Sequence, residues 1–155
     1  MTNRSIFAIT VGSAILMLVV IWFGWGARLL DCRDFGERNI LVDNRAYRLA
    51  VADTPEEREQ GLQGCHQVPE RSGMLFVFEN RQIPTFWMKG MVIPIDIVWV
   101  REGKVVGIKA NLPPLTNQTD NPQVYSPSIP IDAVIELGAN QAAELGIEIG
   151  ATVQF

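Results

Sequence analysis

The residues best suited to chemistry lie in one short stretch, where Trp87, Met88 and Lys89 are followed by Asp96. An ammonium group and a carboxylate on either side of a short loop can form an ion pair, bind a polar ligand or exchange protons with a substrate. Asp96 interrupts an otherwise apolar run over residues 92–100. A carboxylate in such a run must be paired, hydrogen-bonded or exposed, because burying an unpaired charge is costly. We expect a structural ion pair between Lys89 and Asp96, and a ligand cleft or an acid–base pair remains the alternative.

A second polar group lies in the segment Thr54-Pro55-Glu56-Glu57-Arg58. Thr54 is predicted to cap a short helix, Pro55 suits its first position, and the Glu57 carboxylate can accept from the amide of the cap. Arg58 is then expected to pack or pair at the surface, with anchoring of an anionic ligand as the alternative. The candidate ligand-binding or structural cluster therefore comprises Glu57, Arg58, Trp87, Met88, Lys89 and Asp96. None is assigned a catalytic role, because a hydrolase usually also shows a nucleophile and its base.

The chain has two cysteines, Cys32 and Cys65, and one histidine, His66. Neither Cys-x-x-Cys nor His-x-x-x-His occurs, so the sequence does not indicate a metal site. A phosphate-binding glycine loop and a dinucleotide fingerprint are also missing from the sequence, and we expect no cofactor. A Cys65–His66 nucleophile pair is disfavoured, because neighbouring side chains point apart on an extended chain. In an oxidising compartment, Cys32 and Cys65 are able to form a disulfide.

The amino-terminal part of the chain is predicted to be a membrane anchor. Residues 6–25 carry no charged side chain and are long enough to cross the roughly 30 Å hydrocarbon core as a helix. This run is longer than the apolar core of a cleaved signal peptide, and Trp22 and Trp25 suit the membrane interface. We therefore assign residues 1–33 to an uncleaved transmembrane anchor and its linker. Cleavage, or lipidation at Cys32, is the alternative.

The orientation of this anchor is predicted from its flanking charges. Arg4 lies on one side, and Arg28 and Arg33 lie on the other, so the positive charges are nearly balanced. A short amino-terminal tail before a first apolar segment usually stays in the cytoplasm. We expect a single-pass membrane protein whose carboxy-terminal domain lies in the periplasm or outside the cell.

Residues 34–155 are sufficient for one domain with its own core. The chain carries a net charge of -4, and the first 34 residues hold only three of its 13 basic and two of its 17 acidic side chains. The remainder is therefore acidic. A protein that binds duplex nucleic acid needs the opposite sign, so we exclude nucleic acid as a partner.

The pattern of apolar residues in this domain predicts strands more often than helices. Alternation of apolar and polar residues favours a strand at 45–52, and Asp43-Asn44 predicts a hairpin with 39–42. Further strands are predicted at 73–78, 85–89, 95–100, 104–110, 133–137 and 151–155, short helices after Thr54 and at 140–145, and a loop at 112–130, which contains five prolines. We expect a mainly β domain, an antiparallel sandwich or barrel with two short helices, preceded by the transmembrane helix.

Several blocks of sequence resemble the Domain of Unknown Function 192 family. They are 54–58 with Gly61-Leu62, the run 73–78, and above all Phe86-Trp87-Met88-Lys89 followed by 93–97. The resemblance covers most of residues 47–155. It implies a compact, mostly β domain, commonly found behind a signal or anchor segment, with no established activity.

The sequence favours a membrane-tethered extracytoplasmic domain that acts as a binding or envelope-associated module. Its expected partners are the membrane, reached through the anchor, and an unidentified ligand or envelope protein. An enzyme acting on an envelope polymer or a small metabolite through Asp96, Lys89 and Glu57 is the less favoured alternative. A purely structural role beside a membrane protein is the third.

Overall fold

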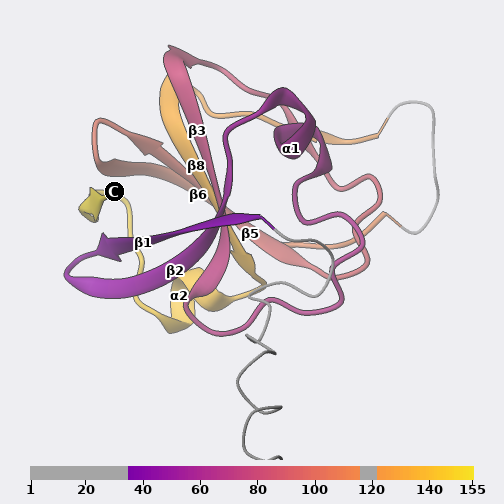
Figure 1. Ribbon diagram of the computed structural model, residues 1–155, viewed down its shortest axis with the longest axis horizontal. Helices are drawn as coiled ribbons and strands as arrows, with labels where there is room; N and C mark the ends of the chain where they lie inside the picture. Colours follow the sequence, from indigo (N-terminus) through magenta and orange to yellow (C-terminus); the bar gives the residue numbers. More distant parts are fainter. Residues whose placement is uncertain (1–34, 116–121) are drawn as a thin grey trace, which may run out of the picture.

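The computed structural model describes residues 35–115 and 122–155 (Figure 1). The anchor predicted over residues 1–33 lies outside this range. Within the described part, no helix has the length and apolar character needed to span a bilayer.

Nine strands and two short helices make up the described domain. The strands are β1 (Gly36–Val42), β2 (Arg45–Ala52), β3 (Ser72–Gln82), β4 (Phe86–Trp87), β5 (Ile95–Arg101), β6 (Lys104–Leu112), β7 (Val124–Tyr125), β8 (Ile131–Gly138) and β9 (Val153–Gln154), and the helices are α1 (Pro55–Gln60) and α2 (Gln141–Glu144).

Seven of the strands form one strongly curled sheet in the order β6-β5-β8-β3-β2-β1-β9, while β4 and β7 form a separate two-stranded ribbon. The two edges of the large sheet approach each other, since Lys104 at the start of β6 makes an antiparallel bridge with Thr152 just before β9. The domain is thus mainly β, as predicted, and its architecture is a half-barrel rather than a sandwich of two sheets (Figure 1).

The sheet departs from the predicted antiparallel arrangement at one place. β2 and β3 pair in parallel, from Arg48 opposite Ser72 to Ala52 opposite Phe76. A parallel pair needs a long crossover connection. Residues 53–71 provide it, and they include α1.

Two local predictions have different outcomes. The β1–β2 hairpin is confirmed, and both turn residues, Asp43 and Asn44, have positive φ angles of 46° and 63°, as a tight hairpin turn requires. The segments 85–89 and 95–100, predicted as strands on either side of a short loop, do not pair with each other. β4 pairs with β7, which arises from the proline-rich stretch predicted as loop, and β5 pairs with β6 and β8.

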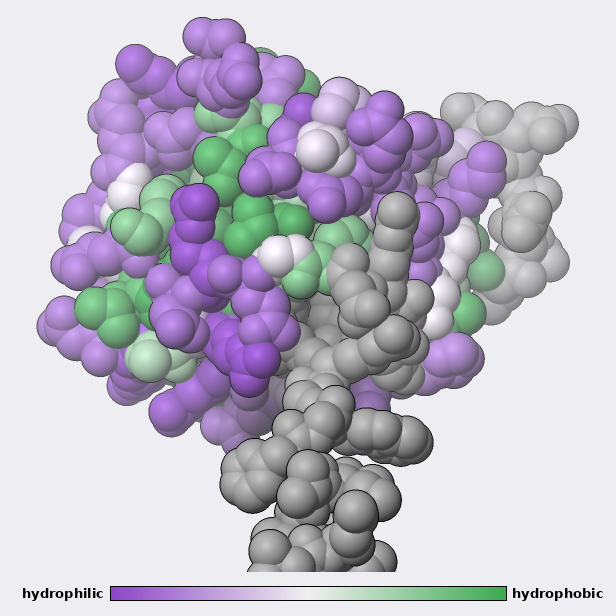
Figure 2. All heavy atoms as spheres, viewed as in Figure 1, coloured by the Kyte–Doolittle hydropathy of each residue, from purple (hydrophilic) through white to green (hydrophobic). Residues whose placement is uncertain are grey.

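Both faces of the central strands are buried, which explains their nearly continuous apolar sequences. Leu75 and Ile135 point into one core cluster, whereas Met74, Phe76 and Val134 point into another on the opposite face. Leu62, just after α1, and Met91 complete the second cluster. On the surface, hydrophobic residues show between hydrophilic ones across the middle of the face in Figure 2.

Candidate functional site

The carboxylate of Asp96, in β5, is buried and accepts hydrogen bonds from three backbone amides. Its Oδ1 accepts hydrogen bonds from Asn111 N at 2.7 Å and Asn140 N at 3.0 Å, and its Oδ2 accepts one from Ala142 N at 2.9 Å. Lys89, the partner expected from the sequence, is exposed and is not among these donors. Asp96 therefore ties the end of β6 and the start of α2 to β5, which is a structural role.

Glu57 forms the predicted capping box at the start of α1. Thr54 Oγ1 accepts from Glu57 N at 3.2 Å, and Glu57 Oε2 accepts from Thr54 N at 3.1 Å and Asp53 N at 3.3 Å. These hydrogen bonds, first those from Thr54, lower the pKa of Glu57. Glu57 thus stabilises the helix start.

Arg58 lies on the same short helix and reaches toward β3. Its Nη1 donates to the carbonyl oxygen of Asp53 at 2.6 Å and to that of Val77 at 3.4 Å. Its guanidinium carbon lies 5.9 Å from the centre of the Phe78 ring, within the range of a cation–π contact. These contacts fix the guanidinium between α1 and β3.

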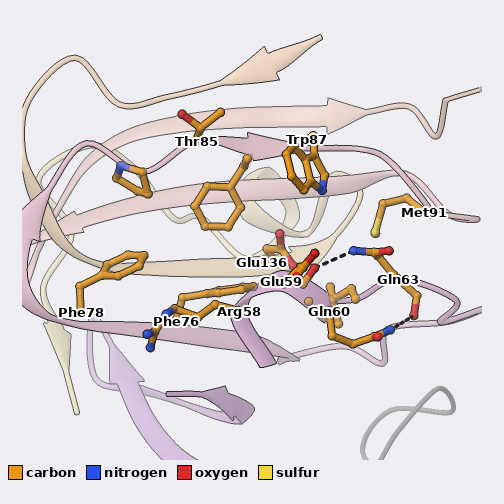
Figure 3. A pocket seen from close by; sticks show the side chains of 14 residues that line it. Arg58, Glu59, Gln60, Gln63, Phe76, Phe78, Thr85, Trp87, Met91 and Glu136 are labelled. Carbon is orange, nitrogen blue, oxygen red and sulfur yellow. Dashed lines mark hydrogen bonds between the residues drawn. The ribbon is translucent and has the colours of Figure 1, made fainter. Parts of the chain in front are cut away.

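A cavity of about 250 Å³ opens between α1 with its following turn and strands β3, β4 and β8 (Figure 3). Phe76 and Phe86 form part of its wall, in an edge-to-face pair with ring centres 5.1 Å apart. Trp87 also lines the cavity and is 42% exposed. Apolar walls with a few polar groups are typical of small-molecule sites.

Glu136, on β8, presents an acidic group to this cavity from the buried face of the sheet (Figure 3). The residue is 5% exposed, and its Oε2 has no hydrogen-bond partner among the described residues. Burial raises the pKa of Glu136 to about 8, against a smaller lowering by a hydrogen bond from the Leu62 amide. The carboxyl group is therefore mostly protonated at neutral pH.

The six residues of the predicted cluster do not lie together in the structure. Only Arg58 and Trp87 line the cavity with Glu136. Met88 is buried in the second core cluster, and Lys89 is exposed outside the cavity lining. Glu57 and Asp96 have the structural roles described above.

Glu136 was not among the residues predicted from the sequence. The available signal was the one that drew attention to Asp96, a single carboxylate within an apolar run, here over residues 133–138.

The family model DUF192, described as "Uncharacterized ACR", matches residues 39–155, three quarters of the chain. The chain belongs to the DUF192 family. The resemblance noted in the sequence is thereby confirmed, and this family has no characterised activity.

Two solved structures share the fold of this DUF192 domain. A protein of unknown function from Novosphingobium aromaticivorans is 28% identical, with a TM-score of 0.70 over 78% of this chain and 86% of that chain. A protein from Sinorhizobium meliloti, described as a candidate transcription regulator, is 24% identical, with a TM-score of 0.70 over 79% of this chain and 95% of that chain. None of the curated proteins matches the chain.

The remaining candidates for chemistry in this DUF192 chain are its thiols and acidic groups. Cys65 is buried in the second core cluster, and Cys32 lies outside the described residues, so their pairing stays a prediction. Among residues 35–115 and 122–155, no group of three or more His, Cys, Asp or Glu side chains is placed to hold a metal ion.

Proposed function

We propose that this DUF192 domain is a membrane-tethered, extracytoplasmic binding module whose ligand enters the cavity beside α1 and reaches Glu136. One observation carries this proposal: a buried carboxyl oxygen without a partner among the described residues lies at an aromatic cavity. An unsatisfied buried polar atom costs about 1–3 kcal/mol, so a ligand that satisfies it gains affinity. Buried acidic groups with shifted pKa values are concentrated at functional sites.

The size of the cavity suits a small ligand or one group of a larger molecule. Its volume of about 250 Å³ lies just below the usual range for drug-sized ligands. Phe76 and Phe86 offer apolar contact area deep in the cavity, and the exposed part of Trp87 is available to cover a bound group. The enzyme alternative loses support, because Asp96, Lys89 and Glu57 do not line this cavity.

Binding at this site predicts a specific dependence on Trp87. Small aromatic and aliphatic fragments that raise the melting temperature of the full chain, held in a nonionic detergent, are expected to bind about tenfold more weakly to Trp87→Ala, since aromatic anchors carry much of the binding energy. Ile149→Ala is the matched control, because Ile149 is 72% exposed and lies outside the cavity lining. Equal affinities for both variants, or a screen without any stabilising fragment, would count against the proposal.

The proposed membrane tether and its orientation predict that the domain is accessible from outside the cytoplasm. Residues 6–25 are uncharged and long enough to cross a bilayer. Protease added to intact spheroplasts is expected to digest residues 39–155. Full protection in spheroplasts, with digestion only after lysis, would reverse the proposed orientation.

The same location predicts a disulfide between Cys32 and Cys65, the two cysteines of the chain. Mass spectrometry of peptides from protein alkylated in its native compartment, without reductant, is expected to find the two linked. Alkylation of both thiols under these conditions would refute the disulfide.

A further inference from the structure

Glu136 Oε2 has no hydrogen-bond partner among the described residues, and its surroundings indicate which chemical group fits beside it. Gly61, immediately after α1, has a φ angle of +51°, which side chains rarely adopt. A Cβ atom at this position would lie 3.6 Å from Glu136 Oε2 and 3.5 Å from Cζ of Phe76. The absence of a side chain at Gly61 therefore leaves space next to both the carboxyl oxygen and an aromatic ring.

The rings around this space favour a positively charged group. Phe76 and Trp87 line the same cavity as Glu136 (Figure 3), and Phe86 also belongs to its lining. Aromatic faces attract ammonium groups through their quadrupole, and this attraction grows when the cation is shielded from water. A carboxylate together with several rings is suited to a cationic amine.

The other charged groups of the cavity lining are one guanidinium and one carboxylate. They are Arg58 and Glu59, both on α1. The guanidinium of Arg58 is already engaged by the Asp53 and Val77 carbonyls and by Phe78, whereas Glu59 is exposed and adds negative charge.

The strands packed against Glu136 add no further charge at this point. Its neighbours in register are Met74 on β3 and Ile97 on β5, and β4 contributes Phe86 and Trp87. Asp96 is next to Ile97 in β5, so the two side chains point to opposite faces of the strand. The Asp96 carboxylate already accepts hydrogen bonds from three backbone amides. An anionic ligand would thus meet two carboxyl groups, Glu136 and Glu59, and one guanidinium, whose Nη1 already donates to two backbone carbonyls.

We propose that the ligand of this cavity presents a protonated amine or quaternary ammonium group to Glu136, with its apolar part against Phe76, Phe86 and Trp87. This inference rests on the proposed binding function. Binding of the cation releases a proton. The O–H bond of the Glu136 carboxyl breaks, the carboxylate pairs with the cation, and the proton passes to the buffer. Because burial raises the pKa of Glu136 to about 8, release approaches one proton for each ligand bound at neutral pH.

Isothermal titration calorimetry of the full chain in a nonionic detergent tests the preference for a cation. Three probes that share a phenyl ring are compared: phenethylamine, 2-phenylethanol and 3-phenylpropionate. Phenethylamine is expected to bind at least tenfold more tightly than 2-phenylethanol at about pH 8.5, and 3-phenylpropionate to bind most weakly. The affinity for phenethylamine should fall about tenfold from pH 9 to pH 7, because Glu136 becomes protonated over this range. Titrations in two buffers with different heats of ionisation should show the release of nearly one proton at pH 7.

Glu136→Gln should remove the preference for phenethylamine, its pH dependence and the proton release, while 2-phenylethanol still binds. Glu148→Gln is the matched control, because Glu148 is exposed and lies outside the cavity lining, and it should change the affinity for phenethylamine no more than about twofold. Binding of 2-phenylethanol as tight as that of phenethylamine would overturn the cation inference and leave the binding function standing. Absence of phenethylamine binding at every pH would also overturn the inference, while the fragment screen with Trp87→Ala decides the binding function separately.

Discussion

Asp96→Asn is expected to lower the free energy of unfolding by about 3 kcal/mol, which corresponds to a fall of roughly 10 °C in melting temperature. The carboxylate accepts three backbone hydrogen bonds, two at Oδ1 and one at Oδ2. An asparagine side chain offers one oxygen and places an NH₂ group against the amide of Ala142 or against those of Asn111 and Asn140. At least one buried donor then loses its acceptor and meets another donor. Urea denaturation of the full chain at neutral pH measures the loss.

Two control variants separate this role from a general effect of charge. Asp132→Asn removes a carboxylate that accepts a single hydrogen bond among the described residues, from Glu102 N at 2.9 Å, and it should cost no more than about 1 kcal/mol. Lys89→Met should be nearly neutral, and its effect should add to that of Asp96→Asn, because the two residues do not interact. Non-additivity between Lys89 and Asp96, or a loss below about 1 kcal/mol for Asp96→Asn, would contradict the structural role.

The importance of Asp96 was predictable from the sequence, but its partners were not. A single carboxylate in an apolar strand needs hydrogen bonds wherever the strand lies. The donors come from Asn111, Asn140 and Ala142, which are 15, 44 and 46 residues away along the chain. Sequence distance favoured Lys89, but β5 pairs with β6 and β8, so the end of β6 and the start of α2, which follows β8, place their backbone amides at the carboxylate.

Local features of the fold were the most accessible to prediction. The β1–β2 hairpin and the capping box of Thr54 and Glu57 depend on neighbouring residues, so their sequence patterns were sufficient. The parallel β2–β3 pair and the β4–β7 ribbon join segments that are distant in sequence. Composition and periodicity do not specify which distant strands pair, and these arrangements required the structure.

The cavity was predictable only in part. Arg58 and Trp87 belonged to the predicted cluster, and they do line the cavity. Glu136 did not, because a strand that is buried on both faces carries no alternation to show where each side chain points. The register that places Met74 opposite Glu136, and the turn after α1 that brings Gly61 beside it, are tertiary features.

Glu136→Gln is expected to remove a pH dependence of stability that the wild-type protein shows between about pH 4.5 and pH 8. The pKa of Glu136 is about 8 in the folded protein, against an ordinary value of 4.5. Between these values the folded state holds a proton that the unfolded state has released, so stability falls as pH rises through the window. A tenfold difference in proton affinity between the two states corresponds to about 1.36 kcal/mol, so the wild type should lose a few kcal/mol across the window, and on the order of 5 kcal/mol at most.

Urea denaturation of both proteins at pH 5, 6, 7 and 8 measures this dependence. Glutamine has nearly the shape of the protonated carboxyl group and stays neutral, so the variant should gain stability relative to the wild type with each step in pH. The difference between the two curves cancels the other titrating groups. Glu57, whose pKa is lowered, affects stability below this window, and Tyr47, whose pKa is raised above 10, affects it above. Parallel curves for the two proteins would show that Glu136 is ionised at neutral pH in the folded state, and that the cavity already satisfies a carboxylate without a ligand.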